Sequence, residues 1–132
     1  MFQTARLYPV RANRFAPHTD TLTIKGRDLT GATLKMQVRD RPNGGQVRAD
    51  LFQVTTAAAE GVMIASTAPI DGLPATVITW RINETTMEAM PLDLGDPGAD
   101  VTLFFDLHIT PAGGLKFVAA EGQLIVKAGV TE

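Results

Sequence analysis

Asp106 and His108 are the two residues whose types and spacing come closest to a catalytic or metal-binding motif. They lie two positions apart in an alternating apolar segment, so a β-strand would project both side chains from one face. A carboxylate beside an imidazole can ligate a metal, as in the facial triads of non-haem iron sites. Such a triad needs a second histidine, and the other histidine of the chain, His18, lies in the N-terminal region. We therefore favour a solvated sheet face over a metal site.

A loop rich in aspartate and glycine is a candidate for calcium binding. Asp93, Asp96 and Asp100 lie close together, with Gly95 and Gly98 between them. Calcium loops supply oxygen ligands at such short spacing. The segment lacks the glutamate that an EF-hand loop carries at its twelfth position, so we interpret it as an acidic turn.

The sequence offers little for nucleophilic catalysis or phosphate binding. Its single serine, Ser66, lies outside any Gly-x-Ser-x-Gly context. The chain has no cysteine, which excludes thiolate nucleophiles, thiolate zinc sites and disulfides. Segment 26–31 begins and ends with glycine but lacks the Gly-Lys-Ser/Thr ending of a phosphate-binding loop. We expect a protein that is not an enzyme and holds no cofactor.

Composition and charge favour one folded domain and disfavour two classes of partner. The chain has 132 residues, of which 45% are hydrophobic and 20% charged, as in ordinary globular proteins. A net charge of −2 leaves no basic excess to neutralise nucleic-acid phosphates. No apolar run approaches the roughly 18 residues of a membrane-spanning helix, and the N-terminus lacks a signal-peptide layout. We expect no nucleic-acid partner, no membrane contact and no signal peptide.

The elements that must position these residues are short β-strands. Apolar and polar residues alternate over 33–39 and 101–109, which predicts half-buried antiparallel strands. Similar reasoning predicts strands over 21–25, 47–54, 62–65, 75–82 and 115–127. The 75–82 segment is apolar on both faces, so we predict a central strand covered on both sides, with Trp80 in the core. A change of phase in the last strand predicts a bulge at Gly122.

Helix is nearly absent from this pattern. Thr85 and Glu88 fit a capping box, and Pro91 limits the segment to one helical turn. Gly, Pro and Asn turns separate the other elements. The fold class is therefore all-β: an antiparallel, Ig-like β-sandwich of about seven or eight strands.

We assign this β-sandwich domain to residues 21–132 and an irregular N-terminal arm, with room for one short strand, to residues 1–20. Pro9 and Pro17 interrupt regular structure in the arm. Its apolar side chains, together with Phe104 on the polar face of the 101–109 strand, are the predicted interface residues: Phe2, Leu7, Tyr8, Phe15 and Phe104. We expect residues 1–18 to become ordered against another subunit or a partner protein.

Two parts of the sequence resemble small β-sandwich proteins of tailed phages and prophages. Leu29–Arg39, a Leu-Thr-Gly turn followed by alternating apolar residues and a final arginine, resembles their opening segment. Their closing segment is similar to Phe105–Thr110, the Pro-Ala-Gly-Gly turn at 111–114, Glu121–Val126 and Gly129–Thr131. The resemblance spans about residues 20–131.

The resemblance implies a non-catalytic virion component of the tail, baseplate or fibre-attachment type. Such a component acts through protein–protein contacts with other phage structural proteins, and it forms a homo-oligomer, with a trimer or hexamer favoured. It is assembled in the cytoplasm of the bacterial host and resides in the virion. The alternative function is a glycan- or receptor-binding β-sandwich module.

Overall fold

The two most regular alternating segments of the sequence pair with each other in the computed structural model. Strand β4 (Thr33–Arg39) runs antiparallel to β8 (Val101–Thr110). The alternating apolar residues of both strands point into the core and most are fully buried, whereas the residues between them, Phe104 included, stay partly or fully exposed. Both predicted strands are confirmed, and their pairing forms the centre of the larger sheet.

The structure describes most of the chain. Residues 1–4, 7–8, 42–43, 92–97 and 129–132 lie outside the description, and three of the predicted interface residues, Phe2, Leu7 and Tyr8, are among them. Asp93 and Asp96 of the acidic loop also lie outside it.

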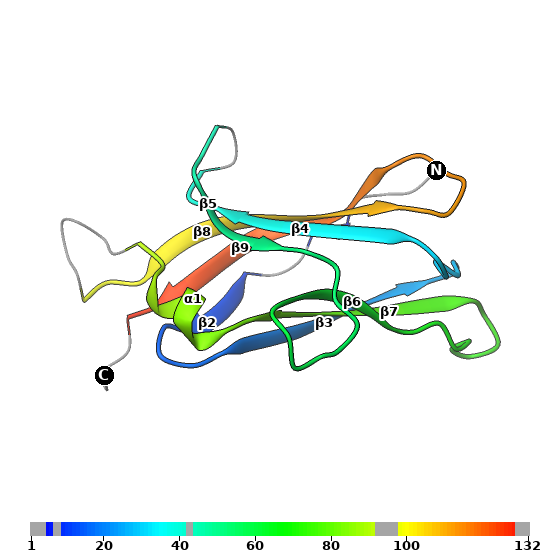
Figure 1. The fold of residues 1–132 in the computed structure, drawn as a ribbon, viewed down its shortest axis with the longest axis horizontal. Coiled ribbons are helices and arrows are strands. Elements are labelled where there is room, and N and C mark those ends of the chain that lie inside the picture. The colour runs from blue at the N-terminus through cyan, green and yellow to red at the C-terminus, as the bar shows by residue number, and fades with distance from the viewer. Residues whose placement is uncertain (1–4, 7–8, 42–43, 92–97, 129–132) are drawn as a thin grey trace.

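Two sheets face each other across the core, as Figure 1 shows. The larger sheet has the order β1/β2, β9, β8, β4, β5, and its remaining strands are β1 (Ala5–Arg6), β2 (Val10–Asn13), β5 (Val47–Leu51) and β9 (Phe117–Lys127). The smaller sheet has the order β3 (His18–Lys25), β7 (Ala75–Ile82), β6 (Gly61–Ser66). Because β1 and β2 follow the same edge of β9, the sandwich counts eight strands, five in one sheet and three in the other.

The strand order is that of an immunoglobulin-like sandwich. Hairpins join β4 to β5, β6 to β7 and β8 to β9, and the chain passes from one sheet to the other after β2, β3, β5 and β7. The order β3–β7–β6 opposite β9–β8–β4–β5 matches the two sheets of that fold. The predicted fold class is confirmed, with one addition: β1 and β2 pair with β9 in parallel rather than antiparallel fashion.

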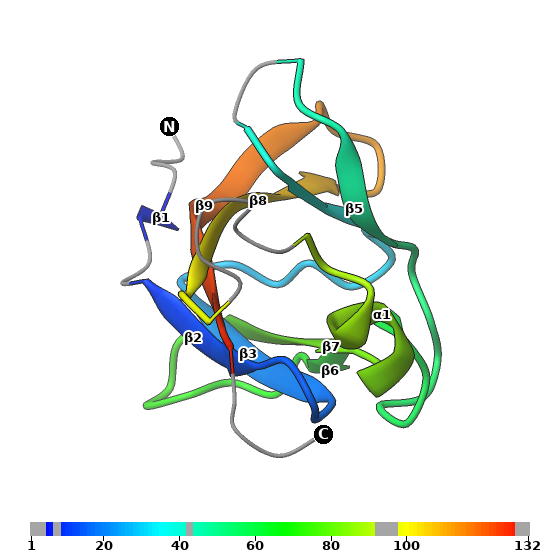
Figure 2. The same ribbon diagram turned by 90° about the vertical axis from the view of Figure 1, so that its left-hand side faces the viewer.

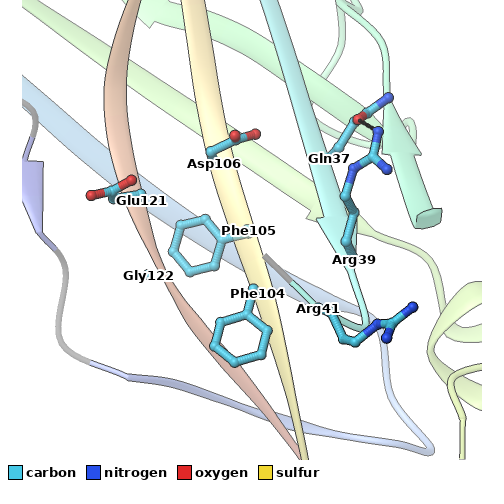
Figure 3. Close-up of a pocket in the computed structure, with 8 residues that line it drawn as sticks. All are labelled: Gln37, Arg39, Arg41, Phe104, Phe105, Asp106, Glu121 and Gly122. Carbon is cyan, nitrogen blue, oxygen red and sulfur yellow. Dashed lines mark hydrogen bonds between the residues drawn. The ribbon is translucent and has the colours of Figure 1, made fainter. Parts of the chain in front are cut away.

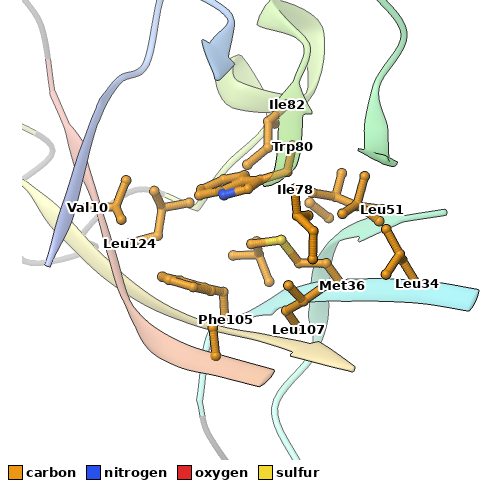
Figure 4. Close-up of a cluster of buried hydrophobic side chains, with 14 of the residues drawn as sticks. Val10, Leu34, Met36, Leu51, Ile78, Trp80, Ile82, Phe105, Leu107 and Leu124 are labelled. Atoms are coloured by element: carbon orange, nitrogen blue, oxygen red, sulfur yellow. The ribbon is translucent and has the colours of Figure 1, made fainter. Parts of the chain in front are cut away.

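Aromatic and aliphatic side chains from both sheets meet in the core (Figure 4). Trp80 of β7 is 4% exposed, and its ring centroid lies 5.7 Å from that of Phe105 on β8. The fully buried side chains of Ile78 and Met36 fill the space beside this pair. The prediction that Trp80 belongs to the core is confirmed, because its ring bridges the two layers.

The position of β7 partly differs from the prediction. It is the central strand of its sheet, with β3 and β6 on either side. Only its inner face is fully covered: Val77, Thr79 and Arg81 on the outer face remain half-buried. The apolar residue Val77 therefore does not signal a covering layer.

The bulge in the last strand lies before Gly122. Leu107 pairs with Ala120 and His108 with Val118, which leaves Ala119 as the extra residue. Ala119 and Ala120 are both buried, because two small side chains can face the core in succession at a bulge. Gly122 itself pairs regularly with Phe105, so the prediction of a bulge at this glycine is wrong.

The start of the chain is more regular than predicted. Strand β2 pairs with β9 over four residues and buries Val10 and Ala12 in the shared core, so residues 10–13 form the short strand for which the predicted arm left room. Strand β3 begins at His18, three residues before the predicted start of the domain. A parallel pairing between strands so distant in sequence leaves no turn signal by which it could be predicted.

Hydrogen bonds from Arg14 connect this N-terminal part to the backbone of residues 90 and 91. Arg14 is 4% exposed, and its guanidinium donates hydrogen bonds to the carbonyls of Met90 (2.7 Å) and Pro91 (2.9 Å). These carbonyls follow the short helix α1 (Glu84–Glu88), which closes one end of the sandwich in Figure 2. Residues 10–14 are therefore held by their own chain.

Helix α1 begins earlier than the capping-box prediction. Its N-cap is Asn83, which makes no side-chain cap hydrogen bond because its Oδ1 accepts one from Arg81 Nε (2.8 Å). The backbone N–H of Asn83 donates to Glu60 Oε2 (2.7 Å). Within the part of the chain that the structure describes, no helix has the length and apolar character to cross a membrane.

Candidate interaction face

The outer face of the larger sheet brings together residues that the sequence scatters over three strands. Because the inward residues of β4, β8 and β9 alternate with outward ones, the outward side chains align in rows across the sheet. One row runs from Arg39 through Phe104 to Gln123, and the next from Gln37 through Asp106 to Glu121. Phe104 thus has polar neighbours on both adjacent strands.

A shallow depression of about 370 Å³ lies over these rows. Figure 3 shows Phe104 between the β9 side and the β4 side of this depression. Its lining consists of Gln37, Arg39, Arg41, Phe104, Phe105, Asp106, Glu121 and Gly122.

Hydrogen bonds fix the polar side chains on the β4 side. Arg39 donates from Nη1 to the carbonyl of Gly45 (2.7 Å) and from Nη2 to Gln37 Oε1 (2.8 Å). Gln37 in turn donates from Nε2 to Asp50 Oδ1 (3.3 Å) on β5. The guanidinium of Arg39 is therefore held in one orientation beside Phe104, and less side-chain entropy is lost when a partner binds there.

Asp106 and His108 do share the outer face, as their spacing predicts. Asp106 Oδ2 lies 3.1 Å from His108 Nε2. The other histidine, His18, belongs to the opposite sheet, where its ring centroid lies 5.1 Å from that of Trp80. Within the described residues, no group of three or more potential metal ligands gathers anywhere, so the pair has no third ligand there.

Phe15 and Asp100, which the structure describes, do not join this site. Phe15 is half-buried in the turn between β2 and β3, where its N–H donates to Asn13 Oδ1 (2.9 Å). Asp100, the described member of the acidic loop, accepts a hydrogen bond from the backbone of Ala128 (3.3 Å). Phe104 is thus the one predicted interface residue among the described residues that lies in the depression.

Sequence reasoning missed most of the residues around Phe104. Gln37, Arg39 and Glu121 are ordinary polar residues of alternating strands, and that pattern is typical of any solvent-facing sheet. It also missed Phe52, which follows β5, is 61% exposed and lies under Lys35, whose Nζ is 5.6 Å from the ring centroid. The predicted strand over 47–54 already alternated in a way that could have identified this exposed ring.

A second hollow of about 250 Å³ lies on the smaller sheet, beside Gly61 and Arg81. Threonines of β3 and β7 line much of it: Thr19, Thr21 and Thr79. Asp20 and Arg81 add charges of both signs, but the aromatic residue of the lining, Trp80, is buried. This hollow therefore offers less for recognition than the depression around Phe104.

No known protein-family model matches this chain, and no curated protein matches it in sequence. The fold accordingly defines a small β-sandwich protein with two sheets, without assigning it to a family.

Proposed function

We propose that this protein is a non-catalytic structural or assembly component of a tailed phage or prophage particle, of the tail, baseplate or fibre-attachment type. It acts through protein–protein contacts with other phage structural proteins and with copies of itself, in a trimer or a hexamer. It is made in the bacterial host cytoplasm and resides in the virion. The resemblance of segments 29–39 and 105–131 to phage β-sandwich proteins supports the assignment to a phage or prophage particle.

The placement of Phe104 carries the part of the proposal that concerns protein contacts. An aromatic ring in the middle of a polar sheet face, beside a hydrogen-bonded arginine, has the composition of an interface centre. The same sheet face offers less support for catalysis or metal binding. Asp106 and His108 contact each other, and among the described residues they belong to no group of three potential metal ligands.

The test is deletion of the gene from the phage or prophage that carries it, followed by electron microscopy of the particles produced. We expect particles with an incomplete or missing tail structure, and restoration when the wild-type gene is supplied in trans. Supplying Phe104→Ser should restore assembly poorly, whereas the matched variant Leu115→Ser should restore it fully, because Leu115 is 90% exposed on a hairpin remote from the depression. Complete, infectious particles without the protein would contradict the proposal.

A glycan- or receptor-binding module is the second candidate, and one observation favours it. The Phe104 ring lines the same depression as the side chains of Gln37 and Asp106, so an apolar sugar face could stack on the ring while polar groups bind its hydroxyls. Trp80 is excluded as the stacking platform by its burial. A glycan array probed with the wild-type chain and with Phe104→Ser tests this function: a signal lost in the variant supports it, and no signal from either chain opposes it.

A further inference from the structure

The depression on the outer face of the larger sheet carries opposite charges on its two sides. Two carboxylates lie on the β9 and β8 side, those of Glu121 and Asp106, and the guanidinium groups of Arg39 and Arg41 lie on the β4 side (Figure 3). Phe104 lies between the two sides, on β8. The face therefore pairs an apolar centre with charges of both signs, separated across the strands.

The side chains of Arg39 and Asp106 on this face are already oriented by contacts within the chain. Arg39 is oriented by Gln37 and the carbonyl of Gly45, and Asp106 contacts His108. Asp50, an acidic residue beside the basic side, accepts a hydrogen bond from Gln37, which places it within the network that holds Arg39. Oriented charges favour one docking geometry over many.

We propose that this face docks onto the same face of a second copy of the chain, related by a two-fold axis near Phe104. An isologous contact requires a self-complementary surface, in which each patch meets the patch of opposite character on its partner. Here the Arg39 side of each copy meets the Asp106 side of the other, twice per contact. The inference rests on the proposed function, and it assigns that function's self-contact to one surface and one symmetry.

The mixed charges also disfavour other occupants of the face. A nucleic acid requires a uniformly basic surface, which the carboxylates of Asp106 and Glu121 contradict.

A two-fold contact forms a dimer when it is the sole contact, and three such pairs around a three-fold axis form a hexamer. The proposal therefore fits the hexamer but not a trimer built from this contact.

A charge-reversal exchange tests the proposal with the full chain. The variants are Arg39→Glu and Asp106→Arg, and their molar masses are measured by size-exclusion chromatography with light scattering over a range of concentrations. The wild-type chain should form a species containing an even number of copies. Each variant alone should self-associate at least about tenfold more weakly, since like charges then face each other twice.

An equimolar mixture of the two variants gives the decisive result. The carboxylate introduced at position 39 of one chain then faces the guanidinium introduced at position 106 of the other, while the remaining pair keeps its wild-type charges. We expect the mixture to regain the wild-type mass, which a structural defect in either variant would not allow. Leu115→Ser serves as the matched surface control and should keep the wild-type mass.

Three outcomes would overturn the inference: a monomeric wild-type chain at all concentrations, a wild-type mass unaffected by either reversal, or a mixture that stays dissociated although circular dichroism shows both variants folded. None of them bears on whether particles form without the gene. The proposed function can therefore survive the failure of this inference, and the two failures are distinguishable.

Discussion

Replacing Arg14 by methionine removes the two hydrogen bonds that join the β2–β3 corner to the segment after α1. The guanidinium donates to the carbonyls of Met90 at 2.7 Å and Pro91 at 2.9 Å, and the residue is 4% exposed. Methionine has a similar length and keeps the apolar contacts of the side chain. The variant therefore isolates the polar contribution of Arg14 to the free energy of unfolding.

The expected magnitude follows from two opposing effects. Hydrogen bonds from a charged donor contribute roughly 1.5–3 kcal/mol each, so losing two costs about 3–6 kcal/mol. Methionine also removes a desolvated charge and a buried Nε that has no hydrogen-bond partner, which recovers about 1–3 kcal/mol. The loss of hydrogen bonds outweighs the recovery, and the net destabilisation is about 2–3 kcal/mol.

Chemical denaturation followed by Trp80 fluorescence measures this difference, and thermal unfolding should show a Tm lower by roughly 8–12 °C for a chain of this length. Arg11→Met on the same strand is the matched control, because Arg11 is exposed, and it should change stability by less than about 0.5 kcal/mol. An Arg14→Met variant as stable as the wild type, or more stable, would refute the reasoning. It would mean that the cost of burying the charge cancels the hydrogen bonds.

Two further predictions concern other parts of the core. Gly61 has a φ of 151°, and a Cβ there would collide with the carbonyl oxygen of Phe52, so Gly61→Ala should destabilise the fold by at least about 2 kcal/mol. The control is Gly72→Ala, at a φ of 76° in open space, which should cost about 1 kcal/mol. Equal losses of stability in urea denaturation would contradict the steric argument. Burial against Trp80 lowers the pKa of His18 below 6.5, and the nearby Asp20 opposes this shift. The unfolded chain therefore binds the proton more readily than the folded chain. The contribution of His18 to the free energy of unfolding should be fully present above pH 6.5 and should be lost as the pH drops from 6.5 towards the lower pKa of the folded state. His18→Gln should reduce the difference in unfolding free energy between pH 7.5 and 5.5, and an unchanged difference would show that other groups cause it.

Local patterns in the amino-acid sequence were enough to predict the strands with strong alternation and the turns between them. The segments that became β4 and β8 each carry apolar residues at every second position, and this period directly reflects which side chains face the core. Turns such as 71–74 were also predictable, since Asp71 and Gly72 adopt the positive φ that those residue types tolerate. Trp80 was assigned to the core on the same local grounds.

The arrangement of the first strand, the last strand and the outer face depends on contacts between segments far apart in the sequence. The parallel pairing of β2 with β9 and the burial of Arg14 depend on residues more than seventy positions away, which no local pattern reports. The bulge lies at Ala119 because the register with β8, not the nearest glycine, sets where an extra residue fits.

In the candidate site, one residue could be predicted from the sequence and its neighbours could not. Phe104 stood out in the sequence because it breaks a polar face, and the structure places it in the depression. Its partners did not stand out, because Arg39, Asp106 and Glu121 become neighbours only through the registers of three strands. Periodicity determines which way a side chain points, whereas strand order and register determine what it meets.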